Sequence, residues 1–78
     1  MNRTELRTIL ESEGFRPDAY SLNGGLPSET YCLSQQGNGW VVYYSERGIR
    51  SGLRPFRDEA EACAYFLEQL RHDPCARP

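Results

Sequence analysis

The chain has 78 residues, of which 38% are hydrophobic, and it carries eleven acidic against nine basic residues, for a net charge of −2. A chain of this length supports one small domain, and this composition excludes an intrinsically disordered protein. The longest uninterrupted apolar run, from Trp40 to Tyr44, is far too short to span a bilayer.

The first predicted element is a helix over residues 3–13. Asn2 and Glu5 have the spacing of a capping box, in which each side chain accepts a hydrogen bond from the other residue's backbone N–H. Gly14 supplies a left-handed stop, and Pro17 prevents any continuation. The apolar stripe of this helix consists of Leu6, Ile9 and Leu10. Its glutamates exclude a signal peptide, whose central region is apolar, so we expect a cytoplasmic protein.

The middle of the chain is predicted to form a sheet. Its centre is the stretch 39–46, the longest run of β-branched and aromatic residues. Residues 19–22 and 30–34 alternate in polarity and are predicted as two shorter strands, joined by a loop rich in turn-forming residues. Tight turns at 35–38 and at Arg47-Gly48 flank the central strand, and a further strand follows the second turn.

The pairing register follows from the turn at Arg47-Gly48. A two-residue turn places Tyr44 opposite Ser51 and Val42 opposite Leu53. The core face of the sheet is then predicted to contain Tyr31, Leu33, Trp40, Val42, Tyr44, Ile49 and Leu53. The opposite face, which we expect to be open, is predicted to contain Cys32, Ser34, Val41, Tyr43, Ser45, Arg50, Gly52 and Arg54.

A second helix is predicted to start at Asp58-Glu59-Ala60-Glu61, whose acids suit a helix N-terminus. Arg71 and His72 suit its C-terminus, Pro74 ends it, and residues 73–78 are expected to form a flexible tail. Its buried stripe comprises Cys63, Phe66, Leu67 and Leu70. The predicted fold class is α+β, with one domain over residues 1–72 in the order α-β-β-β-β-α. An antiparallel sheet of three or four strands is covered by two helices.

The cysteines and the histidine indicate structural roles. The odd count of three cysteines, without a CxxC pair, favours reduced thiols over a disulfide framework or a zinc site. Cys63 lies on an apolar helix stripe and is expected in the core. His72 suits a helix C-terminus electrostatically. We therefore predict no catalytic residues, no cofactor and no metal.

The charges are segregated along the chain. All nine basic residues are arginine, and four of them, Arg47, Arg50, Arg54 and Arg57, lie in one segment whose only acid is Glu46 at its edge. The acids concentrate in the predicted helices. We expect a basic hairpin end and acidic helical flanks.

The open sheet face is the candidate site. Arg50 and Arg54 are predicted to project from it beside Tyr43, with Gly52 leaving that ring uncovered. This pattern fits a solvated surface, a protein partner, or a nucleic acid held by phosphate contacts and base stacking. The order α-β-β-β-α is also that of the double-stranded-RNA-binding domain. That domain needs lysines where this chain has Asp58-Glu59-Ala60-Glu61, which would repel phosphates.

Two stretches carry a resemblance to a known class of proteins. They are Gly39-Trp40-Val41-Val42-Tyr43-Tyr44-Ser45-Glu46-Arg47-Gly48 and, after Phe56, the helix Glu59-Ala60-Glu61-Ala62-Cys63-Ala64-Tyr65-Phe66-Leu67. In these stretches the chain resembles small immunity proteins of bacterial polymorphic-toxin and contact-dependent inhibition systems. The resemblance implies a non-catalytic cytoplasmic protein that binds a cognate toxin domain, such as a nuclease, and blocks its active site.

Two sets of residues are candidates for contacting a partner. The first set lies on the hairpin and consists of Tyr43, Arg47, Arg50 and Arg54. The second set, Glu59 and Glu61 at the start of the last helix, would engage a basic nuclease cleft. The alternative function is a small nucleic-acid-binding or regulatory module that uses the same arginines. The excess of acids over arginines favours the toxin inhibitor.

Overall fold

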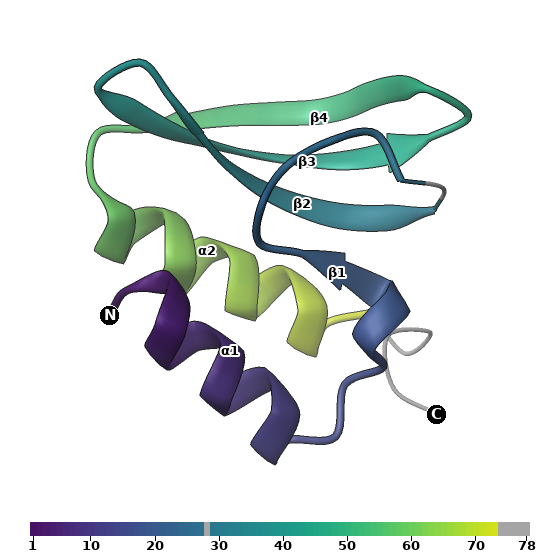
Figure 1. The fold of residues 1–78 in the computed structure, drawn as a ribbon, viewed down its shortest axis with the longest axis vertical. Coiled ribbons are helices and arrows are strands. Elements are labelled where there is room, and N and C mark those ends of the chain that lie inside the picture. The colour runs from purple at the N-terminus through teal and green to yellow at the C-terminus, as the bar shows by residue number, and fades with distance from the viewer. Residues whose placement is uncertain (28, 74–78) are drawn as a thin grey trace.

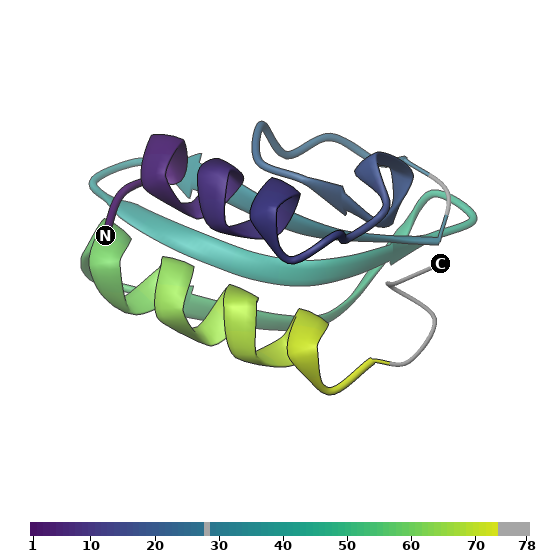
Figure 2. The same cartoon turned by 90° about the horizontal axis from the view of Figure 1, so that it is seen from below.

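The computed structural model describes residues 1–27 and 29–73. In these ranges the elements are α1 (Arg3–Ser12), the short 3-10 helix η1 (Pro17–Ala19), β1 (Tyr20–Ser21), β2 (Thr30–Gln36), β3 (Gly39–Glu46), β4 (Ile49–Phe56) and α2 (Glu59–Arg71). The strands form one sheet in the order β1-β2-β3-β4, and both helices lie on one side of it (Figure 1, Figure 2). This confirms the predicted α+β fold. Apart from Asp73, the predicted tail lies outside the described residues.

The ends of α1 form as the sequence predicts. The Asn2 side chain accepts from the Glu5 N–H at 2.9 Å, and the Asn2 N–H donates to the Glu5 carboxylate at 3.3 Å. Gly14 has a φ of +80°, the left-handed conformation expected at a helix stop. Beyond it, the Phe15 N–H donates to the Leu10 carbonyl at 3.1 Å. Local chemistry alone therefore determines where this helix begins and ends.

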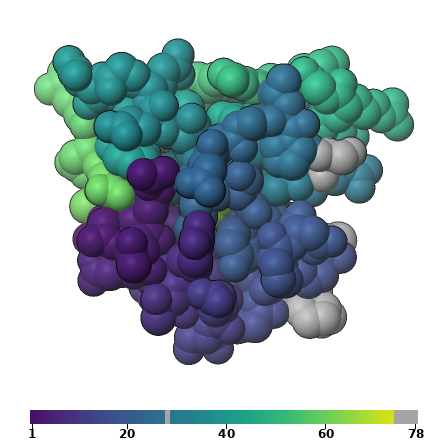
Figure 3. All heavy atoms as spheres, in the orientation of Figure 1, coloured from purple at the N-terminus to yellow at the C-terminus, as the bar shows by residue number. Residues whose placement is uncertain are grey.

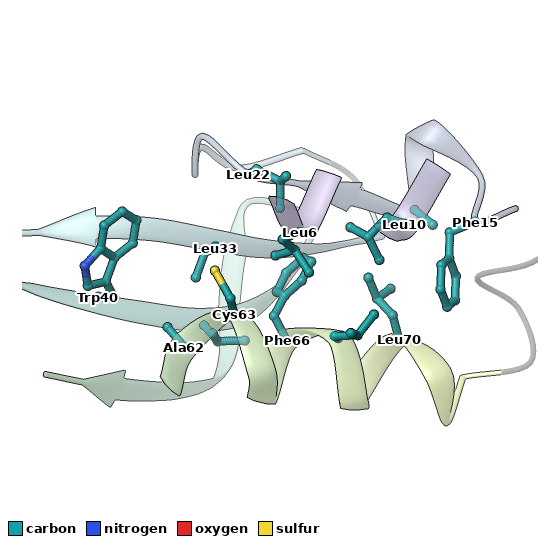
Figure 4. Close-up of a cluster of buried hydrophobic side chains, with 13 residues drawn as sticks. Leu6, Leu10, Phe15, Leu22, Leu33, Trp40, Ala62, Cys63, Phe66 and Leu70 are labelled. Atoms are coloured by element: carbon teal, nitrogen blue, oxygen red, sulfur yellow. The ribbon is translucent and has the colours of Figure 1, made fainter. Parts of the chain in front are cut away.

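The main core lies between the helices and the sheet (Figure 4). On β3, Trp40 and Val42 point toward the helices, as the alternation predicts, and they are 9% and 3% exposed. The buried residues of this core are Leu6, Leu10, Phe15, Ala19, Leu22, Leu33, Trp40, Val42, Ala62, Cys63, Phe66, Leu67 and Leu70. Burial of one large apolar side chain stabilises the fold by about 1.5–3 kcal/mol, so this cluster is the principal source of stability.

The strand β1 departs from the predicted antiparallel arrangement because it pairs with β2 in parallel, with Tyr20 opposite Tyr31. Parallel neighbours require the chain to cross back before the second strand begins. Residues 22–27 make this return, and we call them the crossover segment (Figure 1). Leu22 is still buried in the main core, whereas Gly24 and Gly25 lie near side chains on the sheet face opposite the helices, which we call the outer face. Alternating polarity is the same in parallel and antiparallel strands, so the sequence could not reveal this crossover.

The strand β4 departs from the predicted register at a β-bulge. The sequence predicted that Val42 pairs with Leu53. In the structure Val42 pairs with Arg54, because the register shifts between Val42 and Tyr44. Gly52 has a φ of +64°, the left-handed conformation of the glycine in a G1 bulge, where two residues oppose one. The extra residue reverses the side-chain alternation along the rest of β4. Arg54 therefore moves from the predicted outer face to the helix side of the sheet.

The prediction that Ile49 and Leu53 belong to the core is wrong, since they are 66% and 48% exposed. Leu53 is displaced by the bulge. Ile49 shares the helix side with its partner Glu46, but the hairpin turn projects past the last turn of α2 (Figure 1, Figure 2). No described residue therefore buries it.

Trp40→Ala tests the position of the core. We expect the free energy of unfolding to fall by about 3–5 kcal/mol, because a large buried aromatic ring is removed. The matched variant Ile49→Ala should change it by less than about 0.5 kcal/mol, because Ile49 is largely exposed. Urea unfolding followed by circular dichroism measures both. Equal losses of stability in the two variants would contradict this assignment of the core.

Candidate functional site

The outer face is covered, so the prediction that Tyr43 lies on an open face is wrong. Tyr43 is 1% exposed, and its hydroxyl donates to the Gly25 carbonyl at 2.7 Å. Together with Cys32 and Val41 it forms a second, smaller buried cluster. The Tyr43 hydroxyl is thus bonded to the crossover segment 22–27, and its ring is buried and not open to a partner.

Gly24 allows the crossover segment to lie close to the sheet. Its N–H donates to the Leu33 carbonyl at 3.0 Å. A Cβ at this position would lie 2.7 Å from the Ser34 hydroxyl oxygen, and the φ of +72° is one that other residues rarely adopt. The segment is therefore held against β2 by its own backbone.

The bulge separates the two arginines that were predicted on one face. The Arg50 guanidinium lies on the outer side of β4, 4.9 Å from the centroid of the Tyr43 ring. The Arg54 guanidinium lies on the helix side, 5.0 Å from the Tyr65 ring and 5.9 Å from the Phe56 ring. Each such contact contributes about 0.5–1 kcal/mol at an exposed site, so both guanidinium groups are held in defined positions.

We call Arg47, Arg50, Arg54 and Arg57 the hairpin arginines. All of them are exposed, and none forms an ion pair with a residue in the ranges 1–27 and 29–73. The ion pairs within those ranges are Arg3–Glu59, Arg16–Asp18 and Arg71–Glu13. The hairpin arginines therefore have no ion-pair partner in the described part of the chain, and the hairpin turn protrudes from the body of the molecule (Figure 3).

A concave site lies between α2 and the β3–β4 hairpin, on the helix side of the sheet. It has a volume of about 130 Å³ and is lined by Tyr31, Val42, Tyr43, Tyr44, Ser51, Gly52, Tyr65 and Gln69. We call it the tyrosine groove. The rings of Tyr31 and Tyr44 meet edge to face with their centroids 4.9 Å apart. Arg54 borders the groove, because it pairs with Val42 and lies over Tyr65.

The two acidic candidates have different environments. Glu59 accepts a hydrogen bond from the Arg3 N–H at 3.0 Å, and its carboxylate lies 3.9 Å from the Arg3 guanidinium. It therefore ties the N-termini of the two helices together. Glu61 is exposed, and its N–H donates to the capping side chain of Asp58 at 2.7 Å. Of the pair, Glu61 has the more accessible carboxylate.

Two of the three cysteines lie in the described residues, and both are free and buried. Burial raises the pKa of the Cys32 thiol, and burial together with the charge of Glu59 raises that of Cys63 to about 11. Because the thiolate is the nucleophile, both thiols are poorly reactive at neutral pH. Cys75, which we expect to be reduced and the most reactive, lies outside the described residues.

Within residues 1–27 and 29–73 there is no group of three histidine, cysteine or acidic side chains that could hold a metal ion. In the same ranges no helix has both the length and the apolar character needed to cross a bilayer.

The sequence predictions missed the tyrosine groove. Tyr65 and Gln69 are four residues apart on α2, a spacing that places them on one helix face. That signal could have indicated a shared surface. The other wall comes from Ser51, which pairs with Tyr44 as the turn predicts, and from Gly52, where the unpredicted bulge lies.

Comparison with known proteins finds no matching family model, no similar curated protein and no similar solved structure.

Tyr43→Phe tests the attachment of the crossover segment. The variant keeps the ring and removes the hydroxyl that donates to Gly25, so the free energy of unfolding should fall by about 0.5–1.5 kcal/mol. Exchange of the Gly24 amide hydrogen should also become faster. Urea unfolding and NMR hydrogen exchange measure the two effects. Tyr65→Phe is the control, and equal Gly24 exchange in both variants would show that the Tyr43 hydroxyl does not hold the segment.

The raised pKa of Cys63 predicts a loss of stability at high pH. The folded state keeps the thiol proton up to about pH 11, whereas an unfolded chain loses it near the ordinary value of 9.0. The stabilisation is therefore complete below pH 9 and is lost as the pH rises through 11. Urea unfolding at a series of pH values should show this decline, and Cys63→Ala should make it shallower. An identical decline in the variant would rule out Cys63 as a cause.

Proposed function

We propose that this chain is a non-catalytic binding protein that holds a protein partner through its β3–β4 hairpin, and that it acts as an immunity protein against a cognate toxin. The observation that carries the proposal is the pair Arg50 and Arg54, presented on the two sides of an exposed strand. Neither forms an ion pair with a described residue. The resemblance of the central strand and last helix to immunity proteins supports the toxin-directed role, which would operate in the cytoplasm.

Arginine in this setting suits protein recognition. A guanidinium held over an aromatic ring has already lost part of its conformational freedom, so less entropy is lost when a partner binds. Its planar N–H groups match the two oxygens of a carboxylate. Arginine and tyrosine are also among the residues that most often dominate the energetics of protein interfaces.

The geometry favours a protein partner over a nucleic acid. The ring of Tyr43, which was predicted as a stacking platform, is buried, with its hydroxyl bonded to the crossover segment and the Arg50 guanidinium over the ring. A base could not stack there.

Co-expression tests the proposal. We expect the neighbouring upstream gene to encode a toxin. The chain should restore the growth of cells that produce this toxin and should form a complex with it. The double variant Arg50→Glu, Arg54→Glu should raise the dissociation constant by roughly 30-fold or more, equivalent to about 2 kcal/mol. The free energy of unfolding should fall by only about 1–2 kcal/mol, because the two exposed side chains lose their cation–π contacts and nothing else.

The matched control is Arg7→Glu, which reverses the charge of an exposed arginine on α1. It should leave both affinity and growth rescue unchanged. Loss of affinity in Glu61→Arg with no effect of the double variant would move the interface to the start of α2. Binding of duplex RNA or DNA at physiological salt, abolished in the double variant, would favour the nucleic-acid-binding alternative.

A further inference from the structure

The free edge of β4 is poorly suited to pairing with another strand. Its residues are exposed except for Phe56, which is half-buried. An exposed edge strand is a template for strand addition, but bulges, prolines and charges block it. Here Gly52 interrupts the ladder, and Pro55, opposite Val41, has no N–H to donate. A partner is therefore expected to contact side chains beside β4 and not to extend the sheet.

The tyrosine groove has the size of a single side chain. At about 130 Å³ it is smaller than the pockets of about 300–1,000 Å³ that hold drug-sized ligands. Its walls combine the rings of Tyr31, Tyr44 and Tyr65 with the polar ends of Ser51 and Gln69. Aromatic walls of this kind suit an apolar or aromatic side chain.

The groove continues toward the hairpin turn. A second hollow is lined by Glu46, Arg47, Ile49 and Ser51, and Ser51 lines both hollows. A track therefore runs along the helix side of β4 past the exposed Ile49. At about 3.3 Å per residue, the stretch from Ile49 to Arg54 spans roughly 16 Å, the length of about five extended residues.

The charges along this track select the chemistry of its occupant. Arg54 stands at the inner end and Arg47 at the outer end, and neither forms an ion pair with a described residue. Glu46 also lines the outer hollow and weakens its positive potential. A carboxylate would therefore bind most strongly at Arg54. A second copy of this chain would bring its own hairpin arginines against these, so self-association through this surface is disfavoured.

We infer that the partner presents an extended acidic segment, with an apolar or aromatic side chain in the tyrosine groove and a carboxylate bound to Arg54. This inference rests on the proposed function, because it names the chemistry that the partner brings to the hairpin.

An NMR titration with the synthetic peptide Ac-Asp-Glu-Phe-Glu-Asp-NH2 tests the inference without the toxin. We expect saturable shifts at millimolar peptide in the amide signals of Ser51, Gly52, Tyr65 and Gln69. Replacing the peptide phenylalanine with alanine, or its acids with lysine, should weaken or abolish the shifts. In the protein, Arg54→Ala should raise the dissociation constant about tenfold, whereas Arg7→Ala should leave it unchanged.

A second variant separates the groove from the charge. Ser51→Trp should fill the groove and abolish the phenylalanine-dependent part of the binding, while Arg54 remains. Absence of shifts at millimolar peptide, shifts away from the groove, or equal binding of the lysine peptide would overturn the inference. So would toxin binding that depends on Arg50 but is unaffected by Arg54→Ala and Ser51→Trp, although the proposed function would then stand. Failed growth rescue with intact peptide binding would overturn the toxin-directed role alone.

Discussion

Burial of β3 on both of its faces is the constraint on which the rest of this structure depends. Trp40 and Val42 face the two helices, while Val41 and Tyr43 are buried on the outer face, where the Tyr43 hydroxyl is bonded to the crossover segment. A domain this small has few apolar residues available, and a central strand covered on both sides uses them efficiently. The phenol on the outer side must also find an acceptor when it is buried, and the Gly25 carbonyl provides it.

This arrangement determines which surfaces remain available for binding. The crossover segment is bonded to β2 and to Tyr43 on the outer face, and the helices cover the other face. The strand β4 is left at the edge of the sheet with nearly all of its residues exposed. Charge is concentrated at the same place, because the hairpin arginines flank and occupy this strand. The β3–β4 hairpin thus combines an exposed edge strand with a concentration of positive charge.

The bulge at Gly52 gives this region its shape. Without it, Arg50 and Arg54 would project from one face as a simple basic patch. With it, Arg50 covers the ring of Tyr43, and Arg54 joins the aromatic side chains between the hairpin and α2. Bulges often redirect side chains next to functional sites, and here the result is a groove with an arginine at its rim. An acidic partner that inserts one side chain would use both features together.

The sequence by itself determined the features that depend on neighbouring residues. The capping box at Asn2 and Glu5, the left-handed stop at Gly14 and the turn at Arg47-Gly48 are local hydrogen-bonding and conformational preferences. The face on which Trp40 lies follows from the period of a strand. These features could be predicted because each depends on residues only a few positions away in the sequence.

Tertiary structure alone decided the features that define the candidate site. Apolar and polar residues alternate in the same way along parallel and antiparallel strands. The parallel pairing of β1 with β2, and the crossover that it requires, therefore left no signal in the sequence. A glycine such as Gly52 is compatible with both a regular strand and a bulge, and only pairing with β3 selects between them. That one-residue shift moved Arg54 to the opposite face, where it borders the tyrosine groove. A shift in strand register reverses side-chain directions without changing the local conformational preferences of the residues. The helices, which depend on those preferences, could therefore be predicted, whereas the groove could not.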